Sequence, residues 1–209
     1  MKIKGIEVED FVNYKKCSMF IALGTCDWKC CIEANIPVAI CQNSKLAKTI
    51  DQELSIETIY KLYNENPLSE AIVIGGLEPL TQTQDILDLI KYFREQGCED
   101  DFIIYTGFYP HEISKELILF SEYDNIIIKF GRYIPDDEGY IDPILGIKLA
   151  SKNQYAVKLN KDSKRIIEAM CNNDGYCPCR IDKNEDTKCC CLDFRNQIEG
   201  TCCCGIFSK

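Results

Sequence analysis

The residues best suited to chemistry in this chain are its cysteines. There are 15 of them against a single histidine. Four lie between Cys26 and Cys41, and nine lie between Cys171 and Cys204. One histidine argues against His-rich zinc catalysis and against a Ser/His or Cys/His catalytic triad. The opening stretch, MKIKGIEVEDF, has acids where a secretion signal needs an apolar run, so the cysteines indicate metal binding or thiol redox chemistry rather than a disulfide scaffold.

The first cysteine group has the spacing of a cluster-binding loop. Three residues separate Cys26 from Cys30, Cys31 follows at once, and Cys41 comes ten positions later. Three thiolates on a loop can hold three irons of a [4Fe–4S] cluster and leave the fourth iron open to a substrate or cofactor. Zinc would normally take a fourth protein ligand and a CxxC spacing. The isolated Cys17 and Cys98 are interpreted as small packing residues.

The second group consists of three short units at 177–179, 189–191 and 202–204, each with cysteines at its first and last position. A Cys-x-Cys pair is poor geometry for a zinc knuckle. These six cysteines could supply four cluster ligands and a redox dithiol. The alternative is a structural zinc or metallothionein-like cluster.

Between the two groups, apolar runs alternate with helical spacing. Strands are expected at 17–23, 71–76, 102–107 and 125–131, and helices at 56–63, 80–96 and 114–120. Strands that are apolar throughout predict a parallel sheet covered by helices. Sites in such folds lie at the carboxyl ends of strands, and both Cys26 and Gly75–Gly76 come just at or after a strand end.

The composition changes near residue 160. One short helix is expected at 161–174, and beyond it a cysteine occurs every few residues. A segment of this size cannot bury enough apolar area alone, so a metal or cluster must hold it. We therefore predict an α/β domain over 1–160 and a small cysteine-rich, mainly helical iron–sulfur domain over 161–209.

Charge and hydropathy limit the partners. The net charge of −9 argues against a nucleic-acid surface. The apolar runs are far shorter than the ~20 residues that span a bilayer. No nucleic-acid or membrane partner is expected, and the predicted location is cytoplasmic.

From about residue 17 to 159 the chain resembles the radical S-adenosylmethionine enzymes, and among them the activating proteins of anaerobic ribonucleotide reductases. The similar motifs are CxxxC at 26–30, Cys-x-Asn at 41–43, GGLEP at 75–79, YTG at 105–107, IIIKFGRYIP at 126–135 and LASKNQ at 149–154. The resemblance implies a short partial (β/α) barrel in which Cys26, Cys30 and Cys41 bind a [4Fe–4S] cluster. It also implies that S-adenosylmethionine chelates the open iron, with its adenine against Ile40 and its amino group contacted by the strand end formed by Gly75, Gly76, Glu78 and Pro79.

Two features depart from this family. Its usual third cysteine stands three residues after the second, where this chain has Glu33, so we assume a loop insertion that moves the ligand to Cys41, with Cys31 as the substitute. GGLEP also carries one residue more than the commonest GGEP form. The alternative is a degenerate barrel that keeps a cluster or zinc only as a structural staple.

Residues 163–207 resemble the catalytic subunit of ferredoxin:thioredoxin reductase, whose pattern is CPC, CPC and CHC. The resemblance implies that Cys179 and Cys204 are the redox-active pair, with Cys179 as the outer, attacking thiol beside Arg180. The cluster ligands that it implies are Cys177, Cys189, Cys191 and Cys202.

This second resemblance also has departures. Cys190 replaces a proline and Cys203 replaces the histidine that serves proton transfer in that family. The single histidine, His111, is expected to face solvent near a helix start in the other domain. Cys171, Cys190 and Cys203 are interpreted as spare ligands or packing residues.

Together these features predict an iron–sulfur oxidoreductase with two [4Fe–4S] clusters and S-adenosylmethionine, in which a radical activase is joined to a cluster-based disulfide reductase. The expected partners are a protein substrate, either an anaerobic ribonucleotide reductase or a thioredoxin-like protein, and ferredoxin or flavodoxin as electron donor. The alternatives are an electron-transfer or disulfide reductase module with a non-catalytic barrel, and a zinc-binding interaction protein.

Overall fold

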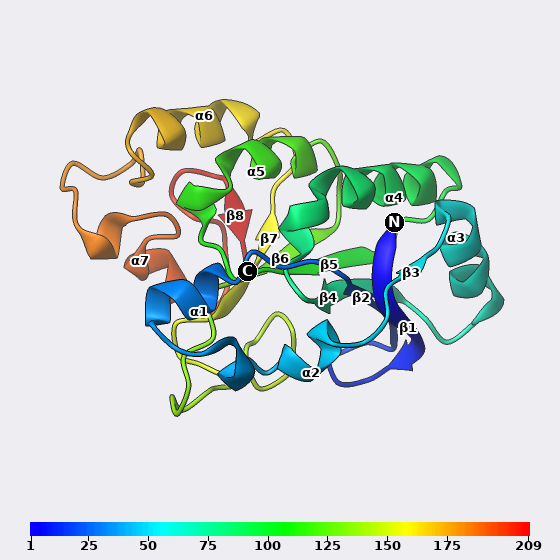
Figure 1. The fold of residues 1–209 in the computed structure, drawn as a ribbon. Coiled ribbons are helices and arrows are strands. Elements are labelled where there is room, and N and C mark those ends of the chain that lie inside the picture. Colours follow the sequence, from blue (N-terminus) through cyan, green and yellow to red (C-terminus); the bar gives the residue numbers. More distant parts are fainter.

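A single eight-stranded mixed sheet organises the chain, whose computed structural model describes residues 1–209 (Figure 1). The strand order is β3-β1-β2-β4-β5-β6-β7-β8, so the sheet is open and has β3 and β8 at its edges. The strands are β1 (Lys2–Asp10), β2 (Ser18–Leu23), β3 (Gln52–Glu53), β4 (Ala71–Gly76), β5 (Asp101–Tyr105), β6 (Ile126–Phe130), β7 (Tyr155–Leu159) and β8 (Phe207–Ser208).

The middle of the sheet is parallel. Strands β2, β4, β5 and β6 run in one direction, with Met19 opposite Ile72 and Phe102 opposite Ile126. On either side, β1 and β7 add antiparallel neighbours. The carboxyl ends of the four parallel strands therefore meet at one edge of the sheet, which is where a site is expected.

Seven helices accompany the strands. Helix α3 begins after Ser55, whose side chain accepts a hydrogen bond from the backbone N–H of Thr58. None combines the length and apolar composition that a membrane span needs. The helices are α1 (Lys29–Ala34), α2 (Ser44–Ala47), α3 (Ile56–Glu65), α4 (Thr83–Glu95), α5 (Ser114–Phe120), α6 (Lys164–Asn172) and α7 (Leu192–Arg195), with short 3-10 turns η1 (Val38–Ile40), η2 (Pro79–Gln82), η3 (Pro110–Glu112) and η4 (Glu185–Thr187).

The two faces of the sheet bury different sets of side chains. Ile72 and Ile74 of β4 join the main core with the apolar faces of α3, α4, α5 and α6, which lie along one side of the sheet in Figure 1. Val73, between them, belongs to a smaller core on the other face with Leu145 and Leu149. Because successive side chains alternate between faces, burial on both faces explains strands that are apolar throughout.

The cysteine-rich segment shares the core of the rest of the chain. Its buried residues Phe194 and Phe207 belong to the same core as the sheet, and Phe207 of β8 pairs with Leu159 of β7. The prediction of a mixed α/β fold with a cysteine-rich C-terminal region is confirmed, although that segment adds a strand as well as helices. The barrel form of the sheet and the division at residue 160 stay predictions.

Candidate iron–sulfur site

A loop at the carboxyl end of β2 carries the first cysteine group. Trp28 has a left-handed backbone (φ 58°) that starts α1, and α1 presents Cys30 and Cys31. Asn35, also left-handed, ends this helix, and η1 brings Cys41 back against Cys31. Short polar side chains such as Asn tolerate that conformation. The loop thus positions its four cysteines without a sheet or long helix of its own.

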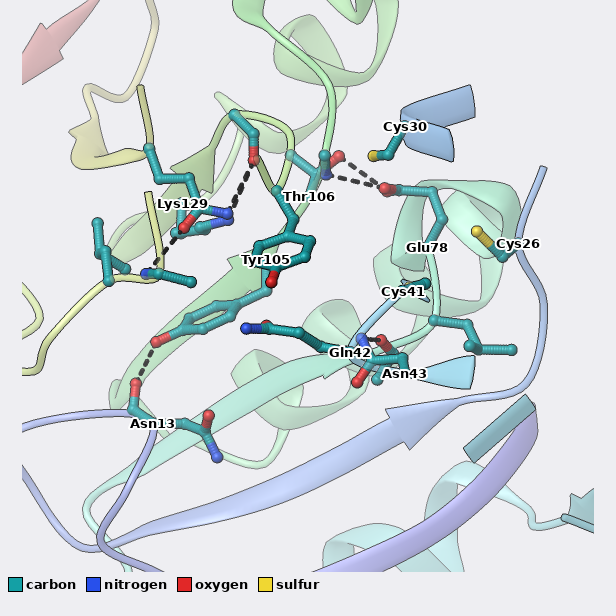
Figure 2. A pocket seen from close by; sticks show the side chains of 18 of the residues that line it. Asn13, Cys26, Cys30, Cys41, Gln42, Asn43, Glu78, Tyr105, Thr106 and Lys129 are labelled. Atoms are coloured by element: carbon teal, nitrogen blue, oxygen red, sulfur yellow. Dashed lines mark hydrogen bonds between the residues drawn. The ribbon is translucent and has the colours of Figure 1, made fainter. Parts of the chain in front are cut away.

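These cysteines form part of the wall of a cavity of about 340 Å³ at the carboxyl ends of the parallel strands (Figure 2). Figure 2 shows Cys26 and Cys30 on either side of the Glu78 carboxylate, and Cys41 lying beyond Glu78 next to Gln42 and Asn43. The volume is within the range of small-molecule sites. Polar groups on the remaining walls come from Asn13, Gln42, Asn43, Glu78, Tyr105, Thr106, Lys129, Tyr133 and Gln154.

The Glu78 side chain is held in this cavity by three hydrogen bonds. Its carboxylate accepts hydrogen bonds from Thr106 Oγ1 (2.8 Å), the Gly107 N–H (2.9 Å) and the Leu80 N–H (3.1 Å). Burial raises the pKa of the Glu78 carboxyl, and these donors oppose that rise by stabilising the charged form. The fixed carboxylate gives the cavity an acceptor for a cationic group.

Two thiols next to Glu78 are held in their neutral form. Burial, with the nearby Glu78 carboxylate, raises the pKa of Cys26 and of Cys30 to about 11. Cys26 Sγ accepts a hydrogen bond from the Trp28 N–H (3.3 Å), which acts in the opposite direction. Because metals bind thiolates, metal uptake here must release protons.

Gly107 lets the chain approach Cys30 closely. A Cβ atom at this position would lie 2.5 Å from Cys30 Sγ, closer than two such atoms can come. Any larger residue would therefore push the sulfur out of place. The glycine of the YTG motif has a steric reason to be there.

Lys129 supplies a buried cation opposite the cysteines. Burial lowers the pKa of its ammonium from 10.5 to about 8, although the Glu78 carboxylate, and the Cys30 sulfur when it is ionised, oppose this. Its Nζ donates to the Gly131 carbonyl (3.1 Å) and has no carboxylate within ion-pair distance. A buried amine of this kind can pair with an anionic group of a ligand.

The predicted cofactor-binding residues fall into two sets. Gly76 and Glu78 line the cavity, whereas Ile40, Gly75 and Pro79 do not. Gly75 instead packs against the ring of Phe20, where a Cβ atom at position 75 would lie only 2.9 Å from Phe20 Cε2. Sequence reasoning missed Lys129 and Gln154 as lining residues, although a lone charge within the apolar run IIIKF was a usable signal.

The second cysteine group separates into buried and exposed members. Cys171, Cys179 and Cys203 are exposed. Cys171 lies apart from the others, with its sulfur 3.0 Å from Ser114 Oγ. The buried members are Cys177, Cys189, Cys190, Cys191, Cys202 and Cys204, and all of them belong to the main core.

Among the buried members, Cys202 and Cys204 are in direct contact, with their sulfurs 3.4 Å apart. A hydrogen bond from Cys204, together with the Phe207 N–H (3.2 Å), lowers the pKa of Cys202, and the same contact raises that of Cys204. The sulfur of Cys177 also contacts Cys204. The structure therefore places Cys204, predicted as a redox thiol, among the predicted ligands, and places Cys179 beside Cys203.

His111 is half buried and does not face open solvent as expected. It packs against Gly175, where a Cβ would lie 2.4 Å from the His111 Cβ, and its imidazole lies beside the backbone carbonyl of Cys189, which favours the charged form. A separate polar cavity of about 410 Å³ adjoins it, lined by residues of both cysteine regions, among them Glu33 of α1 and Cys189. The contact between His111 and Gly175 could not be predicted, because the two residues lie far apart in the sequence.

The donor set fits an iron–sulfur cluster better than a single metal ion. No three Cys, His, Asp or Glu side chains converge closely enough to hold one ion. A [4Fe–4S] cluster binds each thiolate through a different iron and so suits sulfurs that are more widely spaced. Soft thiolates around one cavity are the ligands that such clusters take.

Comparison with protein families identifies the class of this chain. Residues 15–140, more than half of the chain, match the model of the 4Fe-4S single cluster domain. The chain belongs to this family and is an iron–sulfur protein with a [4Fe–4S] cluster. The match includes the whole first cysteine group and ends before the second. Searches of curated proteins and of solved structures each find no match.

Proposed function

We propose that this iron–sulfur protein binds S-adenosylmethionine in the 340 Å³ cavity and cleaves it reductively, as the activating proteins of anaerobic ribonucleotide reductases do. The observation that carries the proposal is the composition of that cavity. One wall presents Cys26, Cys30, Cys31 and Cys41, and the others present the acceptor Glu78 and the cation Lys129. When bound, the cluster supplies the electron that splits the cofactor into methionine and a 5′-deoxyadenosyl group.

The chain's own groups suit the two charges of the methionyl end. The Glu78 carboxylate, held by three donors, can accept from an ammonium, and Lys129 can pair with a carboxylate. The Gly76 carbonyl is already occupied by the side-chain amide of Asn43. We therefore assign amine recognition to Glu78 rather than to the strand-end carbonyl.

The experiment is anaerobic reconstitution followed by measurement of iron, sulfide, methionine and 5′-deoxyadenosine after reduction with dithionite. We expect acid-labile sulfide and both organic products in equal amounts. Bound zinc with no acid-labile sulfide would instead favour the zinc-binding alternative. Bound iron with no 5′-deoxyadenosine would leave a cluster protein without this chemistry.

Variants test the ligand set. Cys41→Ala is expected to abolish 5′-deoxyadenosine formation and Cys31→Ala to spare it; the reverse pattern would make Cys31 the third ligand. Cys98→Ala is the matched control, because Cys98 lies away from the cavity beside Asp100. Its iron content should equal that of the unaltered chain.

A second candidate function is reduction of a partner disulfide by the C-terminal cysteines. The observation that favours it is the exposed Cys179 next to a set of buried cysteines that could hold a second cluster. Two clusters would give roughly eight irons per chain. Cys177→Ser should then lose about half of the iron, whereas Cys179→Ser should keep it and lose disulfide reduction.

The partners follow from these proposals. The protein substrate would be an anaerobic ribonucleotide reductase or a thioredoxin-like protein, and the electron donor would be ferredoxin or flavodoxin. The rival module, an electron-transfer or disulfide reductase with a non-catalytic sheet domain, predicts disulfide reduction without any 5′-deoxyadenosine.

A further inference from the structure

Exposure and proximity single out one pair of cysteines in the C-terminal segment. Cys179 and Cys203 are both exposed, and their side chains lie near enough to interact, as does the buried Cys177 with Cys179. The remaining exposed cysteine of this segment, Cys171, lies against Ser114 instead. Two accessible sulfurs near each other are the arrangement that a redox dithiol requires.

Two turns hold this pair in place. The Arg180 N–H donates to the Cys177 carbonyl (3.1 Å), and the Gly205 N–H donates to the Cys202 carbonyl (2.8 Å). Each turn starts with a buried cysteine and presents an exposed one, Cys179 in the first and Cys203 in the second. The buried cysteines anchor the turns in the core, so pairing of the two exposed side chains would cost little chain entropy.

Cys204 is poorly placed to serve as the partner of Cys179. It is buried, its sulfur is 3.4 Å from that of Cys202, and it also contacts Cys177. Pairing with Cys179 would require it to leave both contacts. Cys203 needs no such rearrangement.

We propose that Cys203, rather than Cys204, is the resolving thiol for Cys179, and that the two form an exposed dithiol which exchanges with a disulfide of a partner protein. The proposal rests on the second candidate function and adds the residue that completes it. Cys204 is then left with the buried cysteines as a further candidate ligand.

Disulfide exchange takes place in two steps. The Cys179 sulfur attacks one sulfur of the partner disulfide, a mixed disulfide forms, and the other partner sulfur leaves as a thiol. The Cys203 sulfur then attacks Cys179, the internal disulfide forms, and the second partner thiol leaves. The two protons of the dithiol end on the two partner thiols, so the partner gains two electrons and the Cys179–Cys203 pair loses two.

The pairing is tested on the full, anaerobically purified protein with diamide, which oxidises dithiols without a partner protein. Free thiols are blocked with N-ethylmaleimide and the disulfides are mapped by mass spectrometry. A Cys179–Cys203 bond is expected. A Cys179–Cys204 bond, or no bond at Cys179, overturns the proposal, and neither result depends on a variant that must fold.

The exchange is tested separately with oxidised glutathione. The unaltered protein should release two glutathione thiols per chain, whereas Cys203→Ser should release one and retain the other as a mixed disulfide at Cys179. Cys171→Ser, the matched exposed control, should release two. Retention in Cys204→Ser but not in Cys203→Ser refutes the assignment. If diamide forms the Cys179–Cys203 bond and glutathione does not react, the pairing stands and the disulfide-reductase function fails.

Discussion

Replacing Lys129 by methionine should stabilise the metal-free protein near neutral pH. The Lys129 ammonium is buried in the cavity wall, and burial lowers its pKa from 10.5 to about 8. Its hydrogen bond to the Gly131 carbonyl is not essential to that carbonyl, which also accepts from Gln154 Nε2 (3.3 Å). Methionine keeps much of the length of the side chain and removes the charge.

The shift of about 2.5 pH units corresponds to about 3 kcal/mol of unfavourable charge burial. Loss of the hydrogen bond offsets about 1 kcal/mol, so the expected gain in unfolding free energy at about pH 7 is about 2 kcal/mol. The folded pKa lies below the unfolded one, so between about pH 8 and 10.5 the unfolded chain binds more protons. Stability of the unaltered protein should therefore rise with pH across that window, and the penalty should be complete below it.

Urea unfolding at about pH 7 and about pH 9.5, in the presence of a thiol reductant, measures this effect. The difference between Lys129→Met and the unaltered chain should shrink as the pH rises. Loss of Lys129 also raises the pKa of Cys30, which acts in the same direction. Lys158→Met, at an exposed position of β7, is the control and should show no such trend. Parallel pH profiles for Lys129→Met and the unaltered protein would refute the reasoning.

Three further predictions concern the same cavity. Gly107→Ala should lose most of the iron of the first site on reconstitution, because its Cβ would meet Cys30 Sγ at 2.5 Å, whereas Gly5→Ala, with no atom within 4 Å, should keep it; equal iron contents would contradict the steric argument. Glu78→Gln should lower the unfolding free energy by about 1–3 kcal/mol, because the NH₂ group of the glutamine amide would face one of the three donors that now donate to the carboxylate. Urea unfolding measures this, and an unchanged midpoint would contradict the three hydrogen bonds. Iron binding should release protons and weaken as the pH falls, because the pKa values of Cys26 and Cys30 are about 11; a pH indicator in weak buffer measures this, and no proton release would show that these thiols are not the ligands.

The elements that the sequence predicts well are those buried on both faces or carrying a strong helical stripe. The helix at 114–120 was predicted with the bounds that the structure has, and the run at 71–76 is β4. The helix expected from 80 begins as a 3-10 turn, because Pro79 and the Glu78 side chain arrange the first residues differently. β1 and β7 were missed, since charged residues interrupt the apolar pattern of β1, and β7 is a run of only five residues, with Lys158 within it.

The site was predictable in its residue types and only partly in its geometry. Cysteine spacing indicated a cluster loop, and the four cysteines do line one cavity with Gly76 and Glu78. Sequence could not show that Cys204 faces inward and Cys203 outward, because the two are adjacent in one turn and only packing decides between them. It likewise could not bring His111 to Gly175 and Cys189, which a tertiary contact alone places side by side.

The shared core makes metal loading a matter of stability for the whole chain. Buried cysteines of the second group pack in the same core as Phe102 of β5 and Phe207 of β8. A metal or cluster bound there only in the folded state would act as a ligand that stabilises folding by mass action, in proportion to the logarithm of its availability. Iron starvation would then lower the fraction of folded protein as well as its activity. The abundance of the intact chain in a cell would itself report on the iron supply.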